Sequence, residues 1–246
     1  MRQIAKFTLL ISTLLISLNS FGFKDNRKFA KDDVVYVHSM SGLSLRKLAS
    51  TKAGRQAIMK YGAKLTIASR PDLDKTLVVE NIKGYWVEVD FNGVKGYAFT
   101  GFLSRFPAPK TKSMSAYLSL LEQSGFADAK YATSKTPRSE TSGPVSQTSL
   151  TLLNADILDG FLIARRLFPI PDSLKLPEYQ LNLRMTIDDP EKPDSILSRK
   201  LTVQIQKTGL PTSIVLRTRV QGSGSDRSIS VVGENTITLM IKDSTD

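Results

Sequence analysis

The residue types that most often carry chemistry are scarce in this 246-residue chain, which has one histidine and no cysteine. Zinc sites built from Cys and His, thiol nucleophiles and Cys-His pairs need residues that the chain lacks. His38 would have to serve by itself as the base of a hydroxyl nucleophile. Because it follows a predicted strand that ends at Val37, we interpret it as an ordinary strand-end histidine. With no nucleotide-binding loop and no nucleophile elbow, the sequence predicts a protein that is not an enzyme and needs no cofactor.

A cluster of carboxylates is the other candidate for chemistry, since oxygen ligands in a turn can bind calcium. The spacing does not match the Asp-x-Asp-x-Asp-Gly pattern of a calcium loop, and two prolines interrupt it. We therefore expect a solvated hairpin turn and no metal site. The four residues are Asp188, Asp189, Glu191 and Asp194.

Aromatic side chains close to cationic ones offer a different function, the binding of a ligand. Aromatic faces beside Lys or Arg hold a sugar, a peptide or a cationic group by stacking and cation–π contact. We expect such faces to be exposed in the first half of the chain. The predicted ligand-binding residues are Tyr61, Tyr85, Tyr97, Phe99 and Arg46.

A predicted hairpin over residues 84–104 would position several of these side chains. Apolar residues at 87, 89 and 91 alternate with Glu88 and Asp90, which is typical of a strand with one buried face. Asn92-Gly93 then supplies the two positive-φ positions of a type I′ turn. Trp86 is the only tryptophan, and we expect it to pack in the core before it contacts a ligand, because large aromatics dominate small cores.

Further short strands are predicted before this hairpin. The ranges 34–37, 43–46, 64–68 and 76–80 are rich in β-branched or alternating apolar residues and are separated by glycine turns. About five or six such strands within a short segment are typical of a small β-barrel. The sequence thus predicts a barrel over residues 34–106.

These segments also carry a family resemblance. Residues 42–46 read G-L-S-L-R and resemble the G-L-N-L-R opening of bacterial SH3 (SH3b) domains, while residues 61–65 are similar to the family's Y-G-T-x-V step. Residues 86–98 resemble its W-x-K-V-x-Y-N-G-x-x-G-Y-V ending, and residues 101–104 its closing turn. The resemblance spans residues 34–105 and implies an SH3-like barrel that binds wall peptide, glycan or protein. The matching positions are Gly42, Leu43, Leu45, Gly62, Trp86, Gly93 and Gly96.

The chain departs from the family pattern in a loop that helps to shape the binding groove. Residues 47–51 read K-L-A-S-T, where family members often have a Gly-Pro-Ser type of loop. Glu88 stands where the family usually has a lysine. The glycines of the motif are expected to meet backbone requirements at turns and close crossings.

The remainder of the chain predicts a second domain of a different kind. Prolines in residues 107–112 predict a stiff linker, and residues 113–246 predict an α+β domain of unrecognised family. Ser113 is expected to cap a first amphipathic helix, and Asn154 a second helix that ends at Arg165 and Arg166. Residues 131–148, rich in Ser, Thr, Pro and Lys, are expected to form a long mobile loop.

Alternating apolar residues fill most of the C-terminal part. They occur in residues 179–187, 201–205, 214–220, 229–231 and 237–241. Such one-sided alternation favours an antiparallel sheet with one face covered, here by the second helix. The predicted fold class is therefore mainly β, with two domains.

The N-terminal residues predict export. Arg2 and Lys6 precede an apolar run, and residues 20–22 offer small residues at the −3 and −1 positions of a signal-peptide cleavage site. Residues 1–22 are thus expected to be a signal peptide, followed by a charged lead-in at 23–33. The run is short for a transmembrane helix, so we expect release to the periplasm or the exterior, with a retained anchor as the alternative.

The charge is uneven, and this bears on the partners. Residues 23–106 hold 15 Lys or Arg against 8 Asp or Glu, while residues 107–246 hold 17 against 15. A basic first half favours anionic surroundings such as wall polymers, lipid headgroups or nucleic acid. Export argues against a specific nucleic-acid partner.

These observations favour an exported, non-catalytic binding protein of the cell envelope, whose partner is wall peptide, glycan or an envelope protein. One alternative is a targeting subunit or a cryptic cell-wall hydrolase, for which only carboxylate-based glycosidase chemistry remains open. Another is a nonspecific binder of polyanions.

Overall fold

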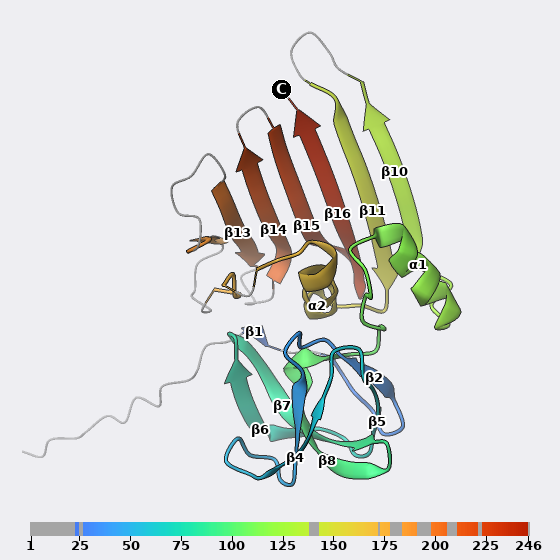
Figure 1. Cartoon of the computed structure of the whole chain (residues 1–246), viewed down its shortest axis with the longest axis vertical. Helices are drawn as coiled ribbons and strands as arrows, with labels where there is room; N and C mark the ends of the chain where they lie inside the picture. Colours follow the sequence, from blue (N-terminus) through green and yellow to red (C-terminus); the bar gives the residue numbers. More distant parts are fainter. Residues whose placement is uncertain are drawn as a thin grey trace, which may run out of the picture.

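The computed structural model describes residues 23–24, 27–137, 143–171, 173–177, 184–190, 198–205, 211–220 and 223–245. Within these ranges the structure is mainly β, with two largely antiparallel sheets and two α-helices (Figure 1), which confirms the predicted class at this level. No helix in the described ranges is long and apolar enough to cross a membrane. The predicted signal peptide at 1–22 lies outside the described residues.

The first sheet has nine strands in the order β4-β3-β8-β7-β5-β2-β9, with β1 and β6 also paired to β7. All of its pairings are antiparallel except the two-residue pairing of β1 with β7. A 3-10 helix, η1, joins β8 to β9. The elements are β1 (Phe23–Lys24), β2 (Val34–Val37), β3 (Leu43–Arg46), β4 (Arg55–Met59), β5 (Lys64–Ile67), β6 (Asp72–Val79), β7 (Ile82–Phe91), β8 (Val94–Phe99), η1 (Thr100–Phe102) and β9 (Leu103–Ser104).

The predicted hairpin is the β7–β8 pair. Asn92 and Gly93 have φ values of 54° and 82°, and the Gly93 N–H donates to the Asp90 carboxylate at 2.8 Å. Positive φ at both central residues is what a type I′ turn requires, so this prediction is confirmed. At Gly96 a Cβ would lie 2.8 Å from the carbonyl oxygen of Arg46, so glycine lets β8 approach β3 closely.

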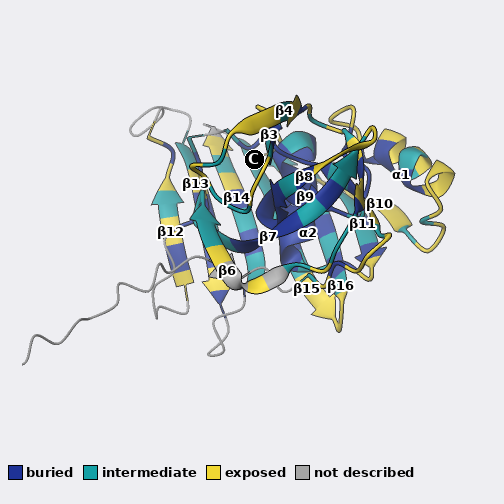
Figure 2. Ribbon diagram, turned by 90° about the horizontal axis from the view of Figure 1, so that it is seen from below, coloured by how far each residue is buried: buried dark blue, intermediate teal, exposed yellow. Residues whose placement is uncertain are grey.

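The second sheet has seven strands in the order β10-β11-β16-β15-β14-β13-β12, all antiparallel. The face that helix α2 covers is buried (Figure 2), and its buried residues, such as Ile229 and Ile237, are apolar. Gly160 allows this approach, since a Cβ there would lie 2.6 Å from Cγ2 of Ile229 and 2.7 Å from Cδ1 of Ile237. The elements are α1 (Met114–Gln123), β10 (Lys130–Thr136), β11 (Val145–Leu153), α2 (Ile157–Leu167), β12 (Arg184–Asp188), β13 (Ser198–Ile205), β14 (Pro211–Val220), β15 (Ser223–Gly233) and β16 (Thr236–Thr245).

Two predictions for this part of the chain are wrong. Residues 131–148 were expected to form a mobile loop, but residues 131–136 belong to β10 and residues 145–148 to β11, while residues 138–142 lie outside the described ranges. Every residue of β10 is exposed, so this edge strand needs no alternation of apolar and polar residues. The sequence therefore lacks the pattern from which a strand is predicted. The second helix is capped by Asp156 and not by Asn154, whose φ of 54° places it in the turn before the helix. Ser113 does cap α1, as predicted.

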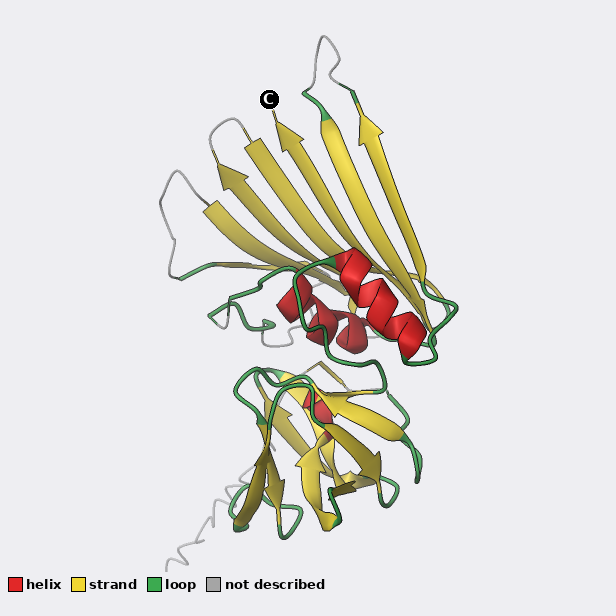
Figure 3. Cartoon of the chain, turned by 45° about the vertical axis from the view of Figure 1, so that its right-hand side comes forward, coloured by secondary structure: helices red, strands yellow, loops and turns green. Residues whose placement is uncertain are grey.

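Helix α2 lies between the two sheets (Figure 3), and a buried carboxylate joins it to the first one. Asp159 Oδ1 accepts a hydrogen bond from Ser104 Oγ at 2.7 Å and lies 3.3 Å from Nη1 of Arg27. The Arg27 side chain also donates to the carbonyl groups of Thr100 and Leu103. Both ionic side chains are almost fully buried, so breaking the contact between them would cost free energy.

The same carboxylate also caps the helix. Its Oδ2 accepts from the N–H of Asp156 at 3.2 Å, which completes a capping box with the Asp156 side chain. A second ion pair, Arg165 to Glu80 at 2.8 Å, joins the other end of α2 to the β6–β7 turn. The helix is thus connected to the first sheet at both of its ends.

Removal of the Asp159 carboxylate should destabilise the whole chain. We expect Asp159→Ala to lower the free energy of unfolding by about 3 to 5 kcal/mol, since it removes the carboxylate that faces the buried Arg27 guanidinium and breaks the capping box. Urea unfolding followed by circular dichroism measures this change.

Asp188→Ala is the matched control, because the Asp188–Lys200 pair is exposed. We expect this variant to remain within about 1 kcal/mol of the natural chain. Equal effects of the two substitutions would contradict a special role for Asp159.

Candidate ligand-binding groove

Strands β7 and β8 present three functional side chains on one face of the first sheet. Glu88 and Tyr97 are direct cross-strand partners, so their side chains lie on the same side. Trp86 is two residues before Glu88 on the same strand and therefore faces the same way. The opposite face of β7 carries Val87 and Val89, which belong to the apolar core.

Two loops complete a groove over this face. Leu48 and Ala49 follow strand β3, while Ser69 and Arg70 follow β5. Together with Trp86, Glu88 and Tyr97 they line a hollow of about 340 Å³.

Two hydrogen bonds close the loop that contains Leu48. The Arg46 guanidinium donates to the carbonyl of Ala53 at 2.7 Å, and the N–H of Lys47 donates to the carbonyl of Gly54 at 3.0 Å. These bonds close the loop at its base, and Leu48, the next residue, is 66% exposed.

The chemistry of the groove is that of recognition. Trp86 and Tyr97 give it aromatic walls, and Glu88 and Arg70 place one acid and one base at its border. Trp86 is 7% exposed, so its ring is fixed by its neighbours before any ligand arrives. The arrangement suits a ligand that offers apolar surface together with polar or charged groups.

Only part of the predicted ligand set meets in this groove. Tyr97 lines it, and Arg46 supports its loop without lining it. Tyr85 and Phe99, which were expected to be exposed, are buried, and Phe99 packs edge-on against Phe102 with ring centroids 5.6 Å apart.

Tyr61 lies elsewhere, at the junction between the two sheets. Its hydroxyl donates to the carbonyl of Pro109 at 3.1 Å. Burial raises the pKa of Tyr61 to about 12, although the nearby Arg166 and Arg165 act in the opposite direction.

Prediction from the sequence missed Trp86, Glu88, Arg70, Leu48 and Ala49 as groove residues. The expectation that Trp86 packs in the core before it contacts a ligand agrees with its 7% exposure, and the strand alternation also placed it on the face of Glu88. That alternation was the available signal. The loop residues had no comparable signal, because their positions depend on how β3 and β5 are paired in space.

His38 is fully buried and makes a structural contact. Its Nε2 lies 2.9 Å from the carbonyl oxygen of Phe106, which fits donation from a neutral ring. Desolvation lowers the pKa of His38 from 6.5 to about 4, outweighing that hydrogen bond and the nearby Asp159, which both raise it. A strand-end histidine of structural importance agrees with the interpretation from sequence.

The carboxylate turn is only partly solvated. Asp188 is exposed, but Asp189 is fully buried and accepts hydrogen bonds from Arg199 at 3.1 Å and from Ser173 at 3.2 Å. The expectation of a solvated turn is therefore wrong for Asp189. Glu191 and Asp194 lie outside the described residues. Among those that are described, no group of three or more His, Cys, Asp or Glu residues is placed to hold a metal ion.

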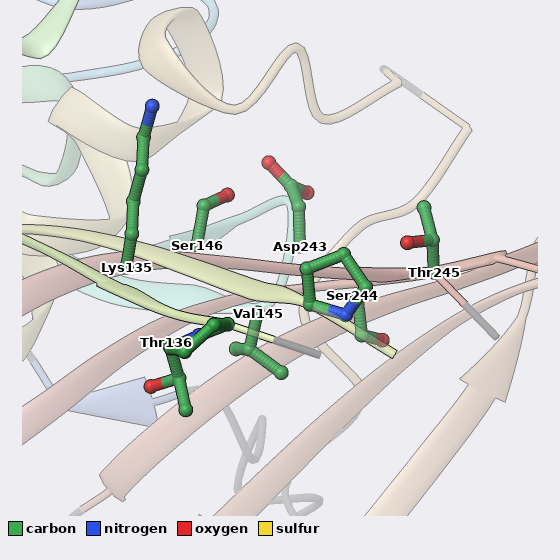
Figure 4. Close-up of a pocket in the computed structure, with 9 residues that line it drawn as sticks. Lys135, Thr136, Val145, Ser146, Asp243, Ser244 and Thr245 are labelled. Carbon is green, nitrogen blue, oxygen red and sulfur yellow. The ribbon is translucent and has the colours of Figure 1, made fainter. Parts of the chain in front are cut away.

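A larger hollow at the ends of β10, β11 and β16 is not a single site. Figure 4 shows the side chains of Lys135, Ser146 and Asp243 on one side of the sheet and those of Val145 and Ser244 on the other. The register agrees, since Lys135 pairs with Ser146 and Ser146 with Asp243. A ligand cannot contact both sides of a hydrogen-bonded sheet at once.

No family model, curated protein or solved structure matches this chain. Its function is therefore inferred from the groove and from the chain's own motifs.

The buried His38 should make stability depend on pH. Its pKa is lower in the folded chain than in the unfolded one, so the unfolded chain binds more protons between about pH 4 and pH 6.5. The stability that a neutral His38 contributes is complete above pH 6.5 and falls by roughly 3 kcal/mol as the pH approaches 4.

Urea unfolding of the natural chain and of His38→Gln across this pH range measures the effect. The difference in unfolding free energy between them should shrink steadily from pH 7 to pH 4.5. Parallel pH curves for the two proteins would show that His38 is not the titrating group.

Proposed function

We propose that this chain is an exported, non-catalytic binding protein of the cell envelope, and that its first sheet is an SH3b-like module that binds a peptide segment. The motif resemblance over residues 34–105 and the signal-like residues 1–22 support this proposal. The observation that carries it is the groove in which Trp86 and Tyr97 stand beside Glu88 and Arg70.

The charges at the groove favour a peptide over a neutral glycan. Glu88 suits an amino group and Arg70 a carboxylate, so a segment with charges of both signs meets a partner for each. The aromatic rings then supply the apolar contact and, toward an ammonium group, cation–π attraction. A neutral sugar would use the rings but leave the two charges without ionic partners.

The volume of about 340 Å³ sets the scale of the contact. It accommodates a short segment of a few residues, which is at the small end of ligand sites. A contact this small supports a weak, reversible association, as in other small transient interfaces. Stem peptides of the cell wall and exposed segments of envelope proteins are both of this chemical type.

Co-sedimentation of the full-length mature protein with isolated cell wall, and co-purification from envelope extract, test this proposal. Tyr97→Ala and Glu88→Gln should each weaken binding about tenfold, since truncation of a central interface side chain costs about 1 to 2 kcal/mol. Tyr131→Ala is the matched control, because Tyr131 is an exposed tyrosine on β10.

The outcomes separate the parts of the proposal. Binding to the wall but not to envelope proteins assigns the peptide to the wall, and the reverse result assigns it to a protein. Equal binding by the natural chain and both groove variants would contradict the groove as the site. Release of muropeptides from purified wall would contradict a non-catalytic role.

A further inference from the structure

The second sheet has an outer face, which is turned away from helix α2 and from the first sheet (Figure 3). Gly160 of α2 packs against Ile229 and Ile237, so these two side chains belong to the inner face. Side chains alternate along a strand, and the positions between the inner ones therefore point outward. One row of the outer face crosses all seven strands in the order Asp188, Lys200, Arg217, Asp226, Lys242, Gln147 and Ser134.

Two arginines on this face share one carboxylate. Arg217 donates from Nε and Nη2 to the two oxygens of Asp226 at 3.1 and 3.2 Å, and Arg219 donates from Nη1 to Oδ1 at 2.7 Å. Glycine at position 224 leaves room for this contact, since a Cβ there would lie 3.0 Å from Nη1 of Arg219. The Arg217 and Arg219 side chains are 50% and 45% exposed, and each guanidinium has more N–H donors than these contacts use.

Positive charge exceeds negative charge around this carboxylate. Lys242 lies directly across from Asp226 on one neighbouring strand, as Arg217 does on the other. Asp226 is the only acid among the residues that pair directly with the cations at 217, 219 and 242. The other pairing residues are Lys200, Ser198, Gly224 and Gln147. The charges of residues 107–246 nearly balance in the sequence, but the fold places an excess of cations on this face.

The surroundings of these cations are those of an open polar surface. Short residues such as Ser228, Ser244 and Gly224 lie next to them on β15 and β16. Within the described strands, no exposed large hydrophobic side chain lies in this row or in the rows directly beside it. A face that binds a lipid bilayer usually inserts such side chains into the interface. The outer face therefore suits an anionic polymer better than a bilayer.

We propose that the outer face of the second sheet binds a linear polymer whose repeating anionic groups are phosphates. With strands about 4.8 Å apart, the cations from Lys200 on β13 to Lys242 on β16 span about 14 Å across the strands. A phosphate has oxygens in more than one plane, so it can accept from both guanidinium groups that Asp226 brings together, whereas a planar carboxylate matches one. This site goes beyond the peptide groove and does not depend on it.

Titration of a fluorescently labelled linear polyphosphate with the full-length protein, followed by anisotropy at several salt concentrations, tests the proposal. We expect saturable binding that weakens as salt rises, because phosphate contacts release counterions. Arg217→Gln and Lys242→Gln should each weaken binding about fivefold and reduce the slope of log K against log salt by about 1. A purely structural role of either residue would not change this slope.

Lys135→Gln is the matched control, because it removes the same charge from the other side of the same sheet. Lys135 lies on the side of Ser146 and Asp243, while Lys242 shares the side of Ser244 (Figure 4). We expect this variant to bind as the natural chain does. An equal effect of Lys135→Gln, or the absence of saturable binding, would overturn the proposal. Unchanged binding by both outer-face variants would also overturn it and would favour the basic first sheet as the site.

Two further ligands test the chemical class. Polyglutamate carries carboxylates in place of phosphates, and we expect it to bind more weakly than polyphosphate at the same salt concentration. Tighter binding of polyglutamate would contradict the assignment to phosphate. Co-sedimentation with phosphatidylglycerol vesicles in the absence of polyphosphate binding would contradict the polymer and indicate a bilayer surface instead.

Discussion

The buried carboxylate of Asp159 is the constraint on which the arrangement of this molecule depends. One oxygen accepts hydrogen bonds from Ser104 of the first sheet and from Arg27 of the N-terminal lead-in, and the other completes the capping box of α2. A charge in such a position is stable only with all of its partners, so the helix start, the end of the first sheet and the N-terminal lead-in must be in place together. The two sheets are thereby placed on opposite sides of one helix (Figure 3).

This arrangement leaves distinct surfaces for binding. The junction uses the lead-in, η1, β9 and α2, whereas the groove is built on β7, β8 and the loops after β3 and β5. Ligand contact at the groove therefore needs no separation of the sheets.

Local patterns in the sequence predicted much of the fold, and long-range contacts account for the failures. Asn92-Gly93 specified its turn by backbone conformation alone, and Ser113 specified the start of α1. The edge strand β10 was not predicted because both of its faces are exposed, and pairing with β11 decides its conformation. Within the site, Tyr97 was predicted, whereas Arg70 and Leu48 reach the groove only through the pairing of distant strands.

Differential scanning calorimetry of the full-length protein tests most directly whether the contacts on either side of α2 join the two sheets into one cooperative structure. The account predicts a single transition whose calorimetric enthalpy equals the van't Hoff enthalpy. The first sheet cannot leave α2 without exposing a buried charge, and the second cannot leave it without exposing the apolar side chains of Ile229 and Ile237. Two separate transitions, or a calorimetric enthalpy well above the van't Hoff value, would contradict it.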